Sequence, residues 1–189
     1  MTGILLVAAT EPELCGHPGL VCGVGPVEAA ASVAAAMARD RPDAVLHVGV
    51  AGARRGAEVG VLDVVVGSQA VYEDLVTVRK LAPTSVDPDR HLAAAVTAAL
   101  DGPHVLAIGT TGRVGGSDGC VVEAMEGFAV LRACELAGVP AVEVRAISNL
   151  VEDDRAAWRL EEAIAVLADA VPRLLAAVGT ALPRAHGTA

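Results

Sequence analysis

The sequence predicts a three-layer α/β/α fold built on a mostly parallel, mixed central sheet. Short apolar runs alternate along the chain with Ala-rich segments of helical length, which is the pattern of strands connected by covering helices. Hydrophobic residues make up 53% of the chain, yet it holds one Phe, one Tyr and one Trp, so the core must consist of aliphatic side chains. The 189 residues are enough for one well-packed domain. We expect that domain over residues 1–182, with a short tail over 183–189.

The predicted strands are apolar runs that end at turn-forming or small residues. The first is bounded by Thr10-Glu11-Pro12, and the second leads into Ala51-Gly52-Ala53, where small side chains allow a ligand to approach Gly52 closely. The runs expected as strands are residues 3–9, 44–50, 61–70, 104–108 and 139–148.

The predicted helices follow from start and stop signals around Ala-rich segments. Pro26 suits a first helical turn, and Asp101-Gly102-Pro103 ends a later helix. The segments expected as helices are residues 27–39, 89–100, 125–138 and about 155–178, while the glycine-rich residues 109–119 are expected to form a loop. In such a fold, ligands bind at the carboxyl ends of the strands.

Charge and composition favour a small-molecule partner. The net charge of -9 and the lack of a basic stripe argue against nucleic acid. No uninterrupted apolar run reaches about 18 residues and no signal peptide is recognisable, so we expect a soluble cytoplasmic protein without a membrane partner. The four cysteines show no C-x-x-C spacing, and we expect free thiols.

We expect neither a metal nor a cofactor. The five histidines lack ligand spacing and are interpreted as surface or packed residues. The segment from Gly23 to Glu28 lacks the third glycine of the dinucleotide fingerprint and follows no clear strand, which argues against a nicotinamide-dependent oxidoreductase.

Three polar residues lie just beyond strand ends or at a helix start: Glu13, Glu126 and Asn149. Each also has an ordinary structural interpretation, because a carboxylate at a helix N-terminus favours the helix dipole and Glu or Asn is common in turns and caps. Their combination is what suggests a site.

The chain resembles the nucleoside phosphorylase and nucleosidase superfamily over nearly its whole length. The most specific stretch is VEAMEGFAVLRACELAGVPAVEVRAISN, residues 122–149, which is similar to the superfamily's Met-Glu segment, the helix after it and the Arg-Ala-Ile-Ser strand end. Further similar segments are VAATEPEL (7–14), GVGPVEAA (23–30), HVGVAGA (47–53) and VVGSQAVYEDL (65–75). The resemblance implies the nucleoside phosphorylase/hydrolase-like fold.

The resemblance also implies roles for individual residues. Glu126 would accept hydrogen bonds from the ribose hydroxyls while Met125 packs against the sugar, and the carboxylate would stabilise the oxocarbenium-like transition state. Glu13 would position and deprotonate water. Arg145 would support the site, although an ion pair with a neighbouring Glu would explain it equally well.

Hydrolysis is favoured over phosphorolysis. Phosphorylases of this superfamily hold phosphate with arginines, one of them near the N-terminus, whereas this chain has no Arg before Arg39. Arg54, Arg55 and Arg113 leave phosphorolysis open.

The strand end Ser148-Asn149 indicates the leaving base. Adenine-specific nucleosidases of the superfamily have Ser-Asp there, whereas the Asn149 amide offers a donor and an acceptor that pair with a 6-oxopurine. With the Glu-Ala-Met-Glu-Gly spacing at 123–127, this is most similar to the futalosine hydrolases, which release hypoxanthine from futalosine in a route to menaquinone. Phe128 or Arg113 would supply a surface for the base.

Some features depart from the family pattern and leave alternatives open. The chain is short, residues 15–21 are too few for the usual pair of strands, and Ala124 replaces an acidic or amide residue. A methylthioadenosine or aminodeoxyfutalosine nucleosidase, a purine nucleoside phosphorylase and a nucleoside-binding protein without catalysis are the alternatives. The apolar composition and the resemblance together predict a homodimer or higher homo-oligomer.

Overall fold

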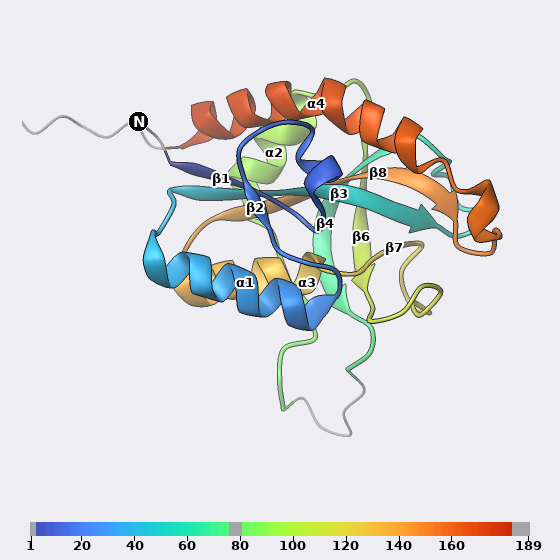
Figure 1. The fold of residues 1–189 in the computed structure, drawn as a ribbon, viewed down its shortest axis with the longest axis horizontal. Coiled ribbons are helices and arrows are strands. Elements are labelled where there is room, and N and C mark those ends of the chain that lie inside the picture. Colours follow the sequence, from blue (N-terminus) through green and yellow to red (C-terminus); the bar gives the residue numbers. More distant parts are fainter. Residues whose placement is uncertain (1–2, 76–80, 183–189) are drawn as a thin grey trace, which may run out of the picture.

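The chain forms three layers in a computed structural model that describes residues 3–75 and 81–182. The predicted tail, 183–189, lies outside the described residues. Helices α1 (Pro26–Arg39) and α3 (Gly127–Ala137) cover one face of the sheet, and α2 (Arg90–Ala98) and α4 (Leu160–Ala181) cover the other (Figure 1). The predicted three-layer α/β/α class is confirmed.

The eight-stranded sheet is mixed. Its order is β2 (Leu20–Val21), β1 (Ile4–Ala8), β3 (Ala44–Ala53), β7 (Val122–Ala124), β6 (His104–Thr110), β4 (Val64–Tyr72) and β5 (Ser85–Val86). The remaining strand, β8 (Ala141–Leu150), runs parallel to β3 and antiparallel to β4. Because β3 also pairs with β7, β7 with β6 and β6 with β4, these pairings close into a ring.

Several predicted boundaries were wrong at points that matter for the site. The helix expected from residue 125 begins at Gly127, because the chain just before it forms the short strand β7, which pairs with β3 and β6. The helix expected from about residue 155 is split into a 3-10 turn η2 (Arg155–Ala157) and α4. The sequence interpretation missed β2, β5 and β7, because strands of two or three residues are too short to show a period.

The core consists of aliphatic side chains on both faces of the sheet, as the composition predicted. Leu46 and Val144 pack against Leu167 and Leu174 of α4, while Val33 of α1 belongs to the cluster on the opposite face. By length and composition α4 is apolar enough to cross a membrane, a test that core helices also pass. In the sequence, α4 does not stand out as an uninterrupted apolar run. Here α4 packs against β3 and β8.

Candidate active site

A cavity of about 350 Å³ opens where β1, β3 and β8 end, within the size range of small-molecule sites. These parallel strands deliver their carboxyl ends to one edge, as expected for an α/β sheet. The segment around β7 and the start of α4 complete the walls. The lining residues are Ala9, Thr10, Pro12, Glu13, Val24, Val50, Ala51, Gly52, Val114, Glu123, Ala124, Met125, Glu126, Ser148, Asn149, Trp158, Leu160 and Ile164.

Glu13 is a buried carboxylate in the 3-10 turn η1 (Glu11–Leu14) directly after β1. Its Oε2 accepts hydrogen bonds from the Thr10 amide at 2.9 Å and the Thr10 hydroxyl at 2.6 Å. Its Oε1 accepts one from the Val50 amide of β3 at 2.9 Å. These donors occupy three of the roughly four acceptor sites of a carboxylate. Glu13 is therefore held rigidly at the cavity wall with room to accept one further proton donor.

Glu126 sits at the N-cap position of α3 but makes no capping hydrogen bond there. Instead, its Oε1 accepts from the Gly25 amide at 3.0 Å and its Oε2 accepts from Arg145 Nη2 at 3.4 Å. Gly25, the N-cap residue directly before α1, has a φ of 94°, a conformation that glycine adopts without strain. The ordinary interpretation of Glu126 as a helix cap is therefore not what its side chain does.

The pKa of Glu126 reflects two opposing influences. Burial is the larger and raises it, while the Arg145 charge and the Gly25 amide lower it. Arg145 is itself surrounded by carboxylates: burial alone would lower its pKa, and Glu143, Glu126 and Glu13 outweigh burial and raise it. The arginine is therefore a fixed positive charge behind Glu126.

Arg145 reaches this position through a buried network on β3 and β8. Its Nε donates to Glu143 Oε1 at 2.8 Å, and its Nη2 lies 2.5 Å from His47 Nε2. His47 Nδ1 lies 3.1 Å from the Val7 carbonyl, so Nδ1 carries the proton and Nε2 accepts from the guanidinium. Burial and then the Arg145 charge lower the pKa of His47 well below its usual value, which keeps the ring neutral. The ion pair with a Glu that the sequence interpretation offered for Arg145 is present, with Glu126 and with Glu143. Its role in supporting the site stays a prediction.

Gly49 allows this network to assemble. A Cβ on Gly49 would meet the Arg145 guanidinium and would lie 2.8 Å from Glu13 Oε1. A side chain at this position would therefore push the Glu13 carboxylate and the Arg145 guanidinium away from the backbone of β3.

Asn149 and Ser148 lie at the other end of the cavity on β8. The Asn149 Oδ1 accepts from the Ser148 hydroxyl at 2.8 Å and its Nδ2 donates to the Leu150 carbonyl at 2.9 Å. A Cβ on Gly52 would lie 3.2 Å from Asn149 Nδ2, so the glycine lets β3 approach the amide. The amide keeps one N–H and one acceptor site for a ligand.

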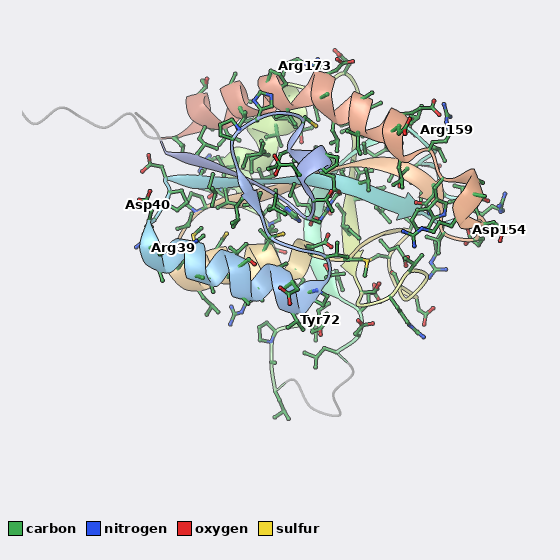
Figure 2. The ribbon with its side chains drawn as sticks, viewed as in Figure 1. Arg39, Asp40, Tyr72, Asp154, Arg159 and Arg173 are labelled. Atoms are coloured by element: carbon green, nitrogen blue, oxygen red, sulfur yellow. The ribbon has the colours of Figure 1, made fainter. Side chains whose placement is uncertain are left out.

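Most of the residues proposed from the sequence line this one cavity: Glu13, Gly52, Met125, Glu126, Ser148 and Asn149. Arg145 lies directly behind it. Phe128 and Arg113, suggested as surfaces for the base, are not among the lining residues. Phe128 stacks on Tyr72 with ring centroids 5.2 Å apart, and Figure 2 places Tyr72 just below α1, above the loop that extends downward.

The sequence interpretation missed other residues of the site. His47 and Glu143 lie in apolar strands whose burial hides any periodic signal. Trp158 and Val114 are wall residues from segments expected as helix and loop. Glu123 also lines the cavity and is 6% exposed. Its charge, three positions before Glu126, was the signal in the sequence that could have identified it as a site residue.

Comparison with known proteins places the chain among enzymes that act on nucleosides. The family model described as the phosphorylase superfamily matches residues 14–124 and 113–183. A futalosine hydrolase from Thermus thermophilus is 34% identical over 194 aligned residues, covering 88% of this chain and 84% of that protein. A futalosine hydrolase from Streptomyces coelicolor is 56% identical over 57 residues, which cover 30% of this chain and 24% of that protein.

Among solved structures, the MTA/SAH nucleosidase of Streptococcus pneumoniae in complex with 8-aminoadenine superposes with a TM-score of 0.81. The match covers 93% of this chain and 99% of that one at 20% sequence identity. The fold is therefore shared in full even where most side chains differ.

Proposed function

The chain belongs to the phosphorylase superfamily, and from this premise we propose that it hydrolyses the N-glycosidic bond of futalosine and releases hypoxanthine. The observation that carries the proposal is the convergence of Glu13, Glu126 and Asn149 on one cavity. Each residue supplies one of the three things that this hydrolysis needs, namely a base for water, a charge beside the ribose and a partner for the leaving purine.

Glu126 holds the ribose. Its carboxylate accepts hydrogen bonds from sugar hydroxyls, and its charge interacts more strongly as the sugar becomes an oxocarbenium-like cation. Burial raises the pKa of this carboxylate, and the Arg145 charge and the Gly25 amide offset part of that effect. Met125, the preceding residue and also in the wall, packs against the sugar.

Glu13 activates the water. Its oxygens are fixed by the Thr10 hydroxyl and the Val50 amide, and one acceptor site remains for the attacking water. As that water adds to the anomeric carbon, the bond from this carbon to the purine nitrogen breaks and the electron pair leaves with the base. One water proton passes to the Glu13 carboxylate, and the departing purine takes up a proton from solvent at N7. The division of labour between Glu13 and Glu126 is that of glycoside hydrolysis, with a purine as the leaving group.

Asn149 selects the base. An amide pairs with the 6-oxo group and a protonated N7 of hypoxanthine, whereas a carboxylate would suit the 6-amino group of adenine. The Ser148 hydroxyl and the Leu150 carbonyl orient the amide. Recognition of an exocyclic group discriminates strongly between bases, because the wrong base leaves a buried polar group unpaired.

The distribution of arginines favours water over phosphate. Among the described residues, no arginine lines the cavity, and Arg145 behind it is engaged by Glu126, Glu143 and His47. Arg54 lies within 4.0 Å of Glu152, and Arg55 is paired with Asp153. A phosphate dianion would need a fork of donors inside the cavity, and none of the described arginines lines it.

The remaining features of the proposal concern the assembly and its setting. We propose a homodimer that forms through α1 and α3, where Val27 is 77% and Leu136 is 72% exposed beside the Tyr72–Phe128 stack. Residues 1–182 form a single domain in this proposal. It places the enzyme in the cytoplasm, on the route to menaquinone, with no cofactor, metal, nucleic acid or membrane as a partner.

The test is a substrate panel. Purified protein is incubated with futalosine, inosine and methylthioadenosine, with and without phosphate, and the released bases are identified by chromatography. We expect hypoxanthine from futalosine at a rate independent of phosphate. Release of adenine alone contradicts the role of Asn149, dependence on phosphate contradicts hydrolysis, and tight nucleoside binding without any release indicates a binding protein.

A further inference from the structure

Glu123 is a buried carboxylate in the cavity wall that the proposed mechanism does not use. It is the central residue of β7 and is 6% exposed. Its Oε1 accepts a hydrogen bond from the Gly115 amide and its Oε2 accepts from the Ser117 amide at 3.0 Å. Two amides of one loop therefore converge on one carboxylate, as in the backbone nests that bind anions.

The sheet places Glu123 at the Asn149 end of the cavity. In the strand register, Glu123 of β7 lies opposite Gly52 of β3, and Gly52 lies opposite Asn149 of β8. The three residues thus form a row across neighbouring strands, and all three line the cavity. In the proposed function, which this inference rests on, that end receives the base.

The loop held by Glu123 supplies a wall of the same cavity. Val114 lines the cavity although it is 52% exposed, so it stands at the mouth. Gly115 has a φ of 74°, and a Cβ there would lie 3.8 Å from Val151, two residues beyond Asn149. The loop therefore lies beside the turn that directly follows β8, the strand that carries Asn149.

Carboxylates anchor this loop at several points. Asp74 accepts from the Gly112 amide at 2.5 Å, and Glu73 accepts from the Gly119 amide at 3.3 Å. Of these anchors and Glu123, only Glu123 is among the cavity-lining residues, and it holds the two amides on either side of Gly116. A Cβ on Gly116 would lie 3.0 Å from the Arg113 carbonyl, so the loop is packed too closely at this position for a side chain.

We propose that Glu123 is a positioning residue that determines base recognition: it fixes the loop at Val114 to Ser117 against the purine held by Asn149. A carboxylate accepts both amide protons, whereas a glutamine directs its own N–H groups at one of them. Replacing it therefore opens the wall at the base without touching Glu13 or Glu126 at the ribose.

The experiment compares Glu123→Gln with wild type for two classes of ligand. The first class is the free bases hypoxanthine, guanine and adenine, and the second is an iminoribitol that carries no base. Inhibition constants are measured for each ligand, together with kcat and KM for the nucleoside. Because Glu123→Gln loses a hydrogen bond to a charged group, we expect it to weaken binding of the preferred base about tenfold or more and to raise KM for the nucleoside similarly. The iminoribitol constant and kcat stay within about twofold. Glu152→Gln is the control, because Glu152 accepts the Arg55 amide at 3.0 Å outside the cavity.

A second variant covers the case in which Glu123→Gln does not fold. Val114→Ala changes a half-exposed wall residue, and we expect it to weaken base binding a few-fold with iminoribitol binding unchanged. The inference is overturned if Glu123→Gln leaves base binding unchanged, or weakens both ligand classes equally, while wild type is active. It is also overturned if folded Val114→Ala leaves base binding unchanged. A wild type that binds none of the bases overturns it together with the proposed function.

Discussion

Replacing Gly49 with alanine is expected to damage stability and catalysis together. The added Cβ would collide with the Arg145 guanidinium and would lie 2.8 Å from Glu13 Oε1. Ordinary van der Waals contacts between heavy atoms require about 3.5 Å, so the Glu13 carboxylate would have to move by about 0.7 Å and the Arg145 guanidinium by more. The Arg145 side chain is 1% exposed and already bonded to Glu143 and His47, so it has no free space to enter.

The magnitude follows from these contacts. Overpacking a core costs about 1–3 kcal/mol, and disrupting a buried ion pair costs about 3–5 kcal/mol. We expect Gly49→Ala to lose about 3 kcal/mol or more of unfolding free energy, a large share of the roughly 5–15 kcal/mol typical of domains. Misplacing catalytic groups by about 1 Å lowers kcat/KM by about 100-fold.

The assay is urea unfolding combined with steady-state kinetics, and the control is Gly179→Ala. Gly179 lies in α4, where a Cβ would meet only Ile4 Cδ1 at 3.5 Å, an ordinary contact. An alanine inside a helix is better than glycine by about 0.5–1 kcal/mol, so this control should be neutral or stabilising with full activity. A Gly49→Ala protein as stable and as active as wild type would refute the close approach of Glu13 and Arg145 at β3.

Three further variants test individual roles. Glu13→Gln should lower kcat by at least about 100-fold while nucleoside binding, measured by calorimetry, is retained; unchanged turnover would remove Glu13 from the mechanism. Asn149→Asp should shift the ratio of kcat/KM values towards adenine nucleosides by at least about tenfold, and an unchanged ratio would contradict base selection by the amide. Because the pKa of His47 is lowered by burial and by Arg145, the unfolded state gains a proton below about pH 6.5 that the folded state does not. Wild type should therefore lose about 1.4 kcal/mol per pH unit more than His47→Gln below that pH in urea unfolding, and identical slopes would show that His47 is not held neutral.

The parts of the fold and the site that sequence predicted are those with a local signal. Glu13 and Asn149 were identifiable because each falls at or just beyond the end of an apolar run, and parallel strands bring such ends to one edge. Glu126 was identifiable from its family segment. Its partner Gly25 was not, because a hydrogen bond between residues 101 positions apart leaves no periodic trace.

What sequence could not predict depended on side-chain direction within buried elements. His47 and Glu143 lie in strands buried on both faces, where alternation disappears and a polar residue gives no hint of its partner. Phe128 is only two residues after Glu126, yet it projects towards Tyr72 because α3 has already begun and turns it to the α1 side. Val114 lines the cavity instead, on a glycine-rich loop whose Gly115 amide donates to Glu123.

The ring of strand pairings has a consequence for how activity appears during folding. Glu126 needs Gly25, Arg145 needs His47 98 residues away, and Glu13 needs Val50 37 residues away. Such non-local pairings form late, since loop closure must precede them. A partly folded chain that has formed one helix or one hairpin would thus contain no part of the site. In a refolding experiment, the return of catalytic activity should therefore mark the completion of the whole sheet rather than the formation of any single element.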